Sequence, residues 1–304
     1  MSDQAAGDEP QDEPKPRRMR KTPMFTAVHA GRYNRQELIR EIDFEEKTSL
    51  ICYVGGDGTE IERDDVLSFA DLLHNIGPNE PIDLMLHTSG GQVDACEKLI
   101  RLLQANLGEA RLRVIVPDMA KSAGTILALA ANEILMSSSS ELGMIDPQYI
   151  MRDSQGNEFA HSVVVYLRAF DRYTSLLSGN VRDAVAERML IDFDAKIVAK
   201  FKGIEQRIRT LAEGLLKRKE NQQYTSIVNE LMNSEKWRTH GQPIGSDDVK
   251  DIGLPVTVLP MHDPKWQRYW ALYCLQRQEI GNRNKIFESA YVSQVLGASD
   301  NKPD

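Results

Sequence analysis

From about residue 48 onward, short apolar runs alternate with segments whose apolar residues recur every three or four positions. The apolar runs predict β-strands at 48–54, 81–87, 111–117 and 132–136. The segments with the longer repeat predict helices over 62–76 and 93–107, and a third helix that includes 126–131. Alternation of strands and helices along a chain indicates parallel βαβ units. The predicted strands are apolar at nearly every position, which is typical of a sheet covered by helices on both faces.

The pattern changes in the second half of the chain. An insertion at about 150–181 is expected to be part loop and part helix. Residues 182–219 predict one long helix or two helices in series, because apolar residues at helical spacing lie opposite a side dense in Arg, Lys and Glu. Residues 241–259 predict a turn, a short helix and a terminal strand, whereas 266–283 and 284–299 predict two further helices.

These segments divide the chain into three parts. Residues 1–24 are acidic and rich in proline, contain almost no apolar residues to bury, and predict a disordered tail. Residues 25–260 are expected to form the main α/β domain, which includes the insertion and the long helical region. Residues 261–304 are expected to form a helical extension at the C-terminus.

The overall composition excludes several classes of protein. Of the 304 residues 41% are hydrophobic, enough for a sizeable core, and the net charge of −8 argues against general binding to nucleic acids. The three cysteines are scattered, which favours neither a disulfide framework nor a zinc site, and Cys52 and Cys96 fall in apolar patterns typical of a core. No run approaches the roughly 20 apolar residues that cross a bilayer, and the N-terminal segment lacks the apolar centre of a secretory signal. We therefore expect a cytoplasmic protein without a membrane span.

Two loops that follow strands contain the residue types that chemistry requires. The first, LHTSGGQVDA (86–95), contains two glycines, whose missing Cβ atoms let backbone N–H groups point at an incoming anion or carbonyl oxygen. The second, MAKSAGT (119–125), places Ser122 among small residues where a strand becomes a helix. In a parallel sheet such junctions gather at the carboxyl ends of the strands, where ligands bind. The two loops are therefore expected to be neighbours in space.

Ser122 has two interpretations at this point. A serine beside small residues and backbone N–H donors has the arrangement of an activated nucleophile next to an oxyanion hole. Serine is also a favoured helix N-cap, and in that case Ala123 and Gly124 merely pack against their neighbours. The sequence of this loop alone is compatible with both.

Four segments, taken in order, resemble one known superfamily. HTSGG (87–91), KSAGT (121–125), ELGMIDPQ (141–148) and WRTHGQPIGSDDVKDIGLPV (237–256) are similar to segments of the Clp-protease/crotonase superfamily. The similarity is greatest to its signal-peptide-peptidase-like branch, in particular the serine dehydrogenase proteinase family, and covers roughly residues 48–260. The resemblance implies an α/β spiral of ββα units with projecting C-terminal helices, in which residues 25–260 form the catalytic domain.

The resemblance also implies roles by position. Ser122 matches the nucleophile. Gly90 and Gly91 match the glycines after the second strand, one of which donates to the oxyanion, and Ala123 would supply the second N–H. Asp146 lies where Clp-type proteases carry their catalytic histidine, so a histidine base is absent at this position.

The base is then expected to be a lysine, because the signal-peptide-peptidase-like branch resembles enzymes with a serine–lysine dyad, in which burial helps the lysine to lose its proton. Lys196 is the preferred lysine, since IDFDAKIVAKF resembles the aspartate-then-lysine helix of the family. Lys200, one turn further along, is the second choice, and Lys121 is the third because the side chains of adjacent residues usually diverge. His240 is a further candidate, since histidine is a common general base, although a hydrogen-bonded histidine in a turn needs no catalytic role.

Three functions fit this sequence. The first is a serine peptidase that acts on a peptide or protein substrate, with Ser122 attacking the peptide carbonyl and with no metal or cofactor required. The second is a crotonase-type acyl-CoA enzyme, which would keep the two N–H donors but would not need Ser122. The third is a non-catalytic scaffold that uses the same fold.

Partners follow from the same resemblance. Related folds form rings through projecting helices, and 182–219 and 266–283 are expected to offer exposed faces, the latter with Trp266, Tyr269 and Trp270. We therefore expect a homo-oligomer. The chain has no phosphate-binding loop of its own, so any ATP dependence would require a separate ATPase partner.

Overall fold

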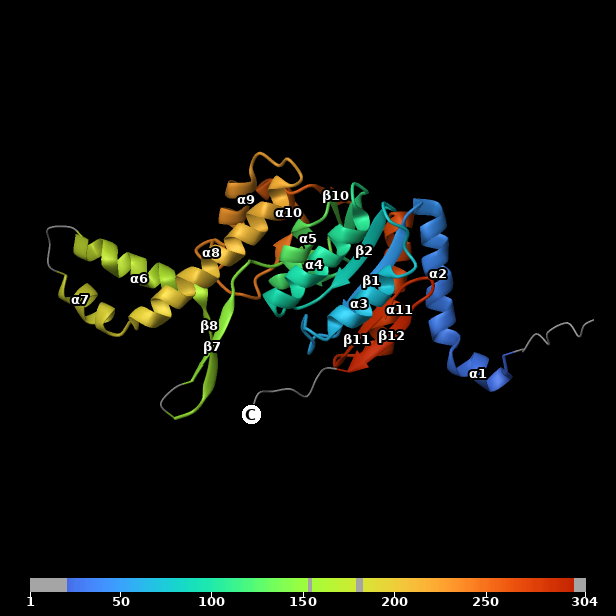
Figure 1. Ribbon diagram of the computed structural model, residues 1–304, viewed down its shortest axis with the longest axis horizontal. Helices are drawn as coiled ribbons and strands as arrows, with labels where there is room; N and C mark the ends of the chain where they lie inside the picture. Colours follow the sequence, from blue (N-terminus) through green and yellow to red (C-terminus); the bar gives the residue numbers. More distant parts are fainter. Residues whose placement is uncertain (1–20, 153–154, 179–182, 298–304) are drawn as a thin grey trace, which may run out of the picture.

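Within residues 21–152, 155–178 and 183–297, which the computed structural model describes, the largest element is a seven-stranded sheet. Its strands are β1 (Ser49–Gly55), β2 (Ile82–His87), β3 (Leu112–Ile115), β5 (Glu133–Met136), β10 (Val256–Val258), β11 (Asn284–Glu288) and β12 (Ser293–Gly297). They lie in the order β10-β5-β3-β2-β1-β11-β12 (Figure 1). The first five pair in parallel, whereas β11 and β12 extend the edge at β1 in antiparallel pairing. The α/β fold class and the four strands predicted from apolar runs are confirmed.

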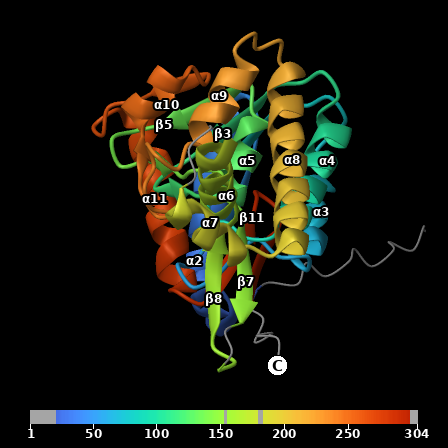
Figure 2. The same ribbon diagram turned by 90° about the vertical axis from the view of Figure 1, so that its left-hand side faces the viewer.

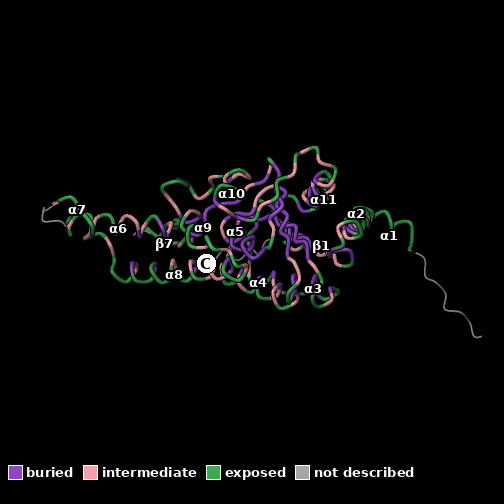
Figure 3. The backbone as a smooth tube through the Cα atoms, turned by 90° about the horizontal axis from the view of Figure 1, so that it is seen from above, coloured by how far each residue is buried: buried purple, intermediate pink, exposed green. Residues whose placement is uncertain are grey.

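Helices cover both faces of this sheet, which explains why its inner strands are apolar throughout. One layer contains α3 (Asp65–Leu73), α4 (Val93–Leu107) and α5 (Ala123–Leu129), and the other contains α2 (Ala30–Glu46) and α11 (Pro264–Ile280). Figure 3 shows α3 and α4 on one side of the strands and α11 on the other. Side chains alternate between the layers, so that in β2 Leu84 packs with the first and Met85 with the second. Cys52 and Cys96 are fully buried in these cores, as predicted.

The helix predicted at 284–299 is wrong, because Asn284–Gly297 forms the antiparallel hairpin of β11 and β12. Ile286 and Phe287 are both fully buried, one against each helical layer, since a strand presents successive side chains to opposite faces. Lys285 is buried as well, and its ammonium donates to Asp65 Oδ1 at 2.8 Å. The consecutive buried residues of this segment belong to a strand that is covered on both faces. In so short a segment, the spacing of apolar residues does not distinguish such a strand from a buried helix.

The C-terminal helix does not project from the body of the molecule. Helix α11 packs along β1 and α2, and Trp266 and Tyr269 are 0% and 1% exposed rather than part of an open face. These aromatic residues belong to the second core layer. The expectation that 261–304 forms a projecting helical extension is therefore corrected.

The helices that project come from the middle of the chain instead. β7 (Gln148–Arg152) and β8 (Glu158–Ser162) form a hairpin that is followed by α6 (Val163–Ser178), α7 (Ala184–Ile191) and α8 (Ala195–Lys217). Figures 1 and 2 show that the hairpin, α6, α7 and the first part of α8 extend away from the sheet as an arm, residues 148–201. In the core of the arm Phe201 packs against Tyr149 and Tyr166. The two helices in series predicted within 182–219 are confirmed, and the predicted insertion contains a hairpin as well as a helix.

A second, three-stranded sheet borders the loop that contains Ser122. It consists of β4 (Met119–Ala120), β6 (Glu141–Leu142) and β9 (Ile244–Gly245), with β6 in the middle. Helix α9 (Tyr224–Leu231) precedes β9, and α10 (Ser246–Ile252) connects β9 to β10. The turn, short helix and terminal strand predicted for 241–259 are confirmed.

Two helices that are absent from the sequence-based prediction precede the first strand. They are α1 (Pro23–Val28) and α2, and the latter buries Ile39 and Ile42 against the second core layer. Of the predicted tail at 1–24, residues 1–20 lie outside the described residues.

Candidate active site

Ser122 lies between β4 and α5, in the connection that follows β3 at the carboxyl edge of the large sheet. Its backbone has φ of 51° and ψ of −112°, a conformation that non-glycine residues rarely adopt and that costs about 1–3 kcal/mol. Hydrogen bonds hold the turn on both sides: Lys121 N–H donates to Thr88 O at 3.0 Å, and Gly124 N–H donates to Lys121 O at 2.7 Å. Strain of this kind persists only where the surrounding structure enforces it, and it is typical of functional sites.

The side chain of Ser122 does not cap the helix that follows. A capping serine accepts a hydrogen bond from the second or third N–H of its helix, and Ser122 makes no such bond. Across the described ranges its Oγ has no hydrogen-bond partner, and the residue is only partly buried. Ser122 thus occupies the N-cap position of α5 without capping the helix through its side chain, and the hydroxyl is available for chemistry.

The Gly-Gly loop lies directly beside Ser122, as the topology of a parallel sheet predicts. Gly90 and Gly91 have φ of 120° and 136°, where side chains are strained. A Cβ on Gly90 would lie 2.9 Å from Cβ of Ser122. A Cβ on Gly91 would lie 2.4 Å from the backbone N and O of Ile61. Glycine is thus required at both positions, at one for the approach to Ser122 and at the other for the pairing with Ile61.

Two backbone N–H groups of these loops, those of Gly91 and Ala123, have no acceptor within the part of the chain that the structure describes. The N–H of Gly90 instead donates to Thr88 Oγ1 at 3.1 Å. Unused N–H donors next to a serine hydroxyl are the elements of an oxyanion hole, because they can stabilise charge that develops on a carbonyl oxygen. Of the three residues predicted for this role, the geometry favours Gly91 and Ala123 as donors.

Replacing Gly91 with Ala is expected to lower the free energy of unfolding by roughly 2–4 kcal/mol. The added Cβ would meet backbone atoms of Ile61, and φ of 136° is strained for any residue with a side chain. Urea unfolding measures the change. Gly203→Ala is the control, since its Cβ would meet open space within α8 and alanine should stabilise that helix by up to about 1 kcal/mol. Equal unfolding midpoints for Gly91→Ala and the unmodified chain would contradict this account of the loop.

Asp146 and His240 form a pair beside the small sheet. Asp146 is 2% exposed, and its Oδ1 accepts a hydrogen bond from Ser162 Oγ at 2.6 Å. Its Oδ2 accepts from Gln148 Nε2 at 2.6 Å and lies 3.5 Å from Nδ1 of His240. The His240 Nδ1 also lies 3.3 Å from Gln148 Nε2, so both neighbours contact the same side of the ring. Because the Gln148 amide nitrogen donates, this contact makes Nδ1 an acceptor and puts the ring proton on Nε2. With its proton on Nδ1 instead, His240 would point it toward the buried carboxylate and leave Nε2 open to accept another.

Strand pairing brings this pair to the neighbourhood of Ser122. The middle strand β6 pairs in parallel with β4, which leads to Ser122, and in antiparallel fashion with β9, which follows His240. Leu142 pairs with Ile244, so the same register four residues further sets Asp146 opposite His240, in agreement with their contact. Neighbouring strands are about 4.8 Å apart, so β4 and β9 are separated by about 10 Å on either side of β6. The register also offsets Ser122 from His240 by about two residues along β6, so the two side chains do not meet in the described chain.

Lys121 is buried, and its ammonium is held on the side of β6. It pairs with Glu141 Oε1 at 2.7 Å and donates to the carbonyl oxygens of Leu142 at 3.2 Å and Gly241 at 3.5 Å. None of these partners is Ser122. Lys121 therefore stabilises the connection between β4 and α5 through contacts with β6 and with Gly241. The contact with Gly241, next to His240, is further evidence that the 240 region lies against the serine loop.

Lys196 and Lys200 both lie on α8 in the arm. Lys196 is exposed in the first turn of the helix, and Lys200 Nζ donates to Tyr149 Oη at 2.7 Å. Neither contacts Ser122 in the described part of this chain. The pairing of Lys196 with Ser122 stays a prediction, and within one chain the structure does not bring the two together.

A second histidine–aspartate contact lies on the other face of the sheet. His87 donates from Nδ1 to Gly55 O at 2.8 Å, and its Nε2 lies 3.3 Å from Asp118 Oδ2. Tyr273 Oη donates to the same Asp118 oxygen at 2.8 Å. The nearby His87 ring and the hydrogen bond from Tyr273 hold the pKa of Asp118 below its usual value. Because this cluster faces α11, it is separate from Ser122.

Side chains that could hold a metal ion do not cluster in the described ranges: no three His, Cys, Asp or Glu residues lie close enough together. The described helices also include none that is both long and apolar enough to pass through a lipid bilayer.

A largely parallel sheet with a strained serine at a strand–helix junction, beside a Gly-Gly loop, defines a Clp-like α/β fold. The family model of ClpP-like SDH-type serine proteinases matches residues 61–293, and the chain belongs to this family. The family predicted from the four motifs is therefore confirmed, and the match includes the C-terminal strand β11.

Two similar proteins come from Methanocaldococcus jannaschii and are both described as uncharacterized. MJ0137 is 32% identical over 222 residues, which cover 72% of this chain and 67% of that protein. MJ1495 is 29% identical over 208 residues, which cover 68% of this chain and 61% of that protein. The chain thus spans about two thirds of the length of these relatives.

Similar solved structures include a mutant of the 1510-N membrane-bound stomatin-specific protease. It is 15% identical, with a TM-score of 0.42, and the match covers 70% of this chain and 81% of that one. ClpP1 from Listeria monocytogenes is 16% identical, with a TM-score of 0.40, and the match covers 74% of this chain and 96% of that one. Both similarities are distant, and they do not identify the reacting residues of this chain.

Proposed function

We propose that this chain is a serine peptidase in which Ser122 is the nucleophile. The observation that carries the proposal is the strained backbone of Ser122, which presents a hydroxyl without a hydrogen-bond partner in the described residues. In the reaction the Oγ attacks a peptide carbonyl carbon. The C–N bond then breaks, the amine leaves with a proton, and water hydrolyses the acyl-enzyme that remains.

The oxyanion of the tetrahedral intermediate would be stabilised by the N–H groups of Gly91 and Ala123. Both donors are fixed by the backbone, so they need not reorganise as charge develops on the oxygen. Gly90 contributes differently, because its N–H is engaged by Thr88 and its missing Cβ leaves room against Ser122.

For the general base the geometry favours His240 over the three lysines. With its proton on Nδ1, the ring would face the buried carboxylate of Asp146 and Nε2 would accept the proton of Ser122. This tautomer requires Gln148 Nε2 to give up its contact with Nδ1. In Ser-His-Asp triads the carboxylate likewise orients the imidazole and stabilises the imidazolium. His240 does not contact Ser122 in the described chain, so the proposal requires the turn that carries His240 to approach Ser122 when substrate binds.

Lys196 would serve as the base only if Ser122 met it from another copy of the chain or after a movement of the arm. In the described chain its side chain is exposed and does not contact Ser122. The two hypotheses make opposite predictions for single substitutions, which are argued in the Discussion.

Two other functions use the same fold. A crotonase-type acyl-CoA enzyme would rely on the N–H donors alone, and a non-catalytic scaffold would need neither the donors nor the serine. Neither of these two functions explains why the backbone of Ser122 is strained. Hydrolysis of a fluorogenic peptide and its loss in Ser122→Ala would support the peptidase, whereas thioester turnover retained in Ser122→Ala would support the acyl-CoA enzyme.

We also propose that the chain forms a homo-oligomer through its arm. Apolar side chains are exposed there in a single chain: Ile150, Val165, Val185 and Ile191 are 58%, 51%, 64% and 70% exposed. Exposed apolar side chains that come together in one patch mark protein contacts, and we propose that these four do so on the arm. Light scattering at micromolar concentration is expected to give at least twice the 34.3 kDa mass of one chain, and Ile191→Lys should lower it. A monomeric mass for the unmodified chain would sink this proposal.

A further inference from the structure

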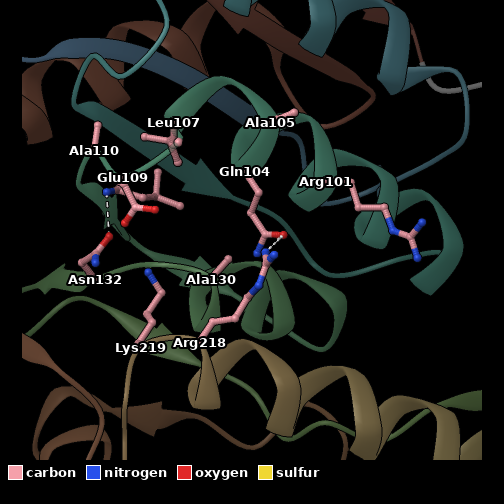
Figure 4. A pocket seen from close by; sticks show the side chains of 12 residues that line it. Arg101, Gln104, Ala105, Leu107, Glu109, Ala110, Ala130, Asn132, Arg218 and Lys219 are labelled. Atoms are coloured by element: carbon pink, nitrogen blue, oxygen red, sulfur yellow. Dashed lines mark hydrogen bonds between the residues drawn. The ribbon is translucent and has the colours of Figure 1, made fainter.

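A cavity of about 510 Å³ lies at the edge of the large sheet opposite Ser122. Ser122 follows the carboxyl end of β3, whereas the cavity contacts Leu112, which begins β3, and Asn132, which precedes β5. Its remaining walls come from the last two turns of α4, the loop after α4, Ala130 at the end of α5, and the two residues that follow α8 (Figure 4). We call it the amino-edge pocket. No function described above uses it.

The amino-edge pocket carries positive charge, and its exposed lining is more polar than apolar. Arg101, Arg218 and Lys219 line it together with a single acid, Glu109, although the whole chain carries a net charge of −8. Most of the other lining residues are leucine, alanine or glycine. The volume falls in the range of about 300–1,000 Å³ that is typical of small-molecule sites.

Lys219 is the most informative side chain of the pocket. Figure 4 shows it directed into the cavity from the end of α8. Its ammonium has no hydrogen-bond or ion-pair partner among the described residues, whereas Arg218 donates to Gln104 and Arg101 pairs with Glu97. Burial lowers the pKa of Lys219 to about 8. A desolvated cation without a counter-ion is unfavourable, and a bound anion would compensate for the lost hydration.

We propose that the amino-edge pocket binds a small organic anion. Its phosphate or carboxylate group would pair with Lys219 and Arg218, and its apolar part would lie against the leucine and alanine side chains. Bidentate contact with a guanidinium together with an ammonium is the usual way in which proteins hold such groups.

The cations have a simpler explanation that a test must exclude. Helices α4 and α5 both end at this pocket, and the carbonyl ends of helices attract positive side chains without any ligand. In that case Lys219 and Arg218 would only compensate the partial negative charge at the two helix ends, and the pocket would not bind anionic compounds more tightly than neutral ones.

Pyridoxal 5′-phosphate and pyridoxal are matched probes, because they share an aldehyde and differ in the phosphate group. The neutral amine of Lys219 adds to the aldehyde carbon, loss of water gives an imine, and borohydride reduces the imine to a stable secondary amine. The neutral form increases as pH rises through about 8, so labelling should increase between about pH 7 and 9. Arg101, Arg218 and Glu109 are the charged groups that line the pocket with Lys219, and burial alone causes the lowered pKa of Lys219.

Peptide mass spectrometry at about pH 7.5 and 0.15 M salt reads the outcome. Pyridoxal 5′-phosphate should label Lys219 about tenfold faster than pyridoxal does, and about tenfold faster than it labels Lys217, an exposed lysine over the Tyr224 ring. Arg218→Gln should bring the two aldehydes close to equal rates. Protection by inorganic pyrophosphate would identify a phosphate ligand, and protection by benzoate a carboxylate ligand. Equal labelling by the two aldehydes, or no protection by either anion, would overturn the proposal in favour of the helix-end explanation.

Discussion

Ser122→Ala is expected to lower peptide hydrolysis by about 10³-fold or more while the chain still folds. The hydroxyl that attacks the carbonyl is removed, and the oxyanion donors that remain can supply only residual catalysis. The measurement is kcat/KM on a peptide that the unmodified chain cleaves, with urea unfolding in parallel. The free energy of unfolding should change by about 1 kcal/mol or less, because the lost hydroxyl has no hydrogen bond to a described residue.

Ser122→Gly tests the strain separately from the chemistry. Glycine tolerates φ of 51° and ψ of −112° better than serine, so this variant should be inactive but more stable by about 1 kcal/mol. Ser175→Ala, an exposed serine on α6, is the control and should leave the rate unchanged. Full hydrolysis by Ser122→Ala would end the peptidase proposal, and a less stable Ser122→Gly would contradict the account of backbone strain.

The second large effect is expected at the histidine–aspartate pair. His240→Ala should lower kcat/KM by about 10²–10⁴-fold, and Asp146→Asn should have a similar effect because the imidazole loses its orienting carboxylate. Added imidazole should restore part of the activity of His240→Ala but none of that of Ser122→Ala. Since groups that act as a unit are not additive, the double variant of Ser122 and His240 should be no slower than Ser122→Ala alone.

Lys196→Ala distinguishes this hypothesis from the serine–lysine dyad. If His240 is the base, the variant should retain activity within about threefold, because an exposed lysine in the arm then only contacts solvent. If Lys196→Ala instead loses as much activity as Ser122→Ala, Lys196 is the general base. In that case His240→Ala should keep full activity. Either outcome leaves the assignment of Ser122 as nucleophile intact.

Most of the large sheet could be predicted because a strand covered on both faces must be apolar along its length. This physical constraint is local, so β1, β2, β3 and β5 are visible as short runs, and α4 agrees with its predicted range of 93–107. The two site loops were predicted for a related reason. Parallel strands bring their carboxyl ends to one edge, and small residues are required where two backbones approach each other.

What the sequence did not reveal depends on contacts between distant segments. Helix α2 is partly buried through polar residues, since Arg35 is 3% exposed and its Nε donates to Glu288 Oε2 at 2.9 Å. The pattern of apolar residues along a sequence does not predict a buried ion pair between distant segments. The pairing of Asp146 with His240 depends on the register of β6 with β9, so each residue was a separate candidate until the strands were paired. The partners Gln148 and Ser162 carry no sequence signal of their own.

The most direct measurement is the site of covalent labelling by a fluorophosphonate probe, which reacts only with an activated serine. Intact-mass spectrometry of the unmodified chain should show one adduct per chain, and peptide mapping should place it on Ser122. His240→Ala should react much more slowly, and Ser122→Ala should not react at all. An unlabelled chain, or an adduct on another residue, would contradict the central claim that Ser122 is the nucleophile.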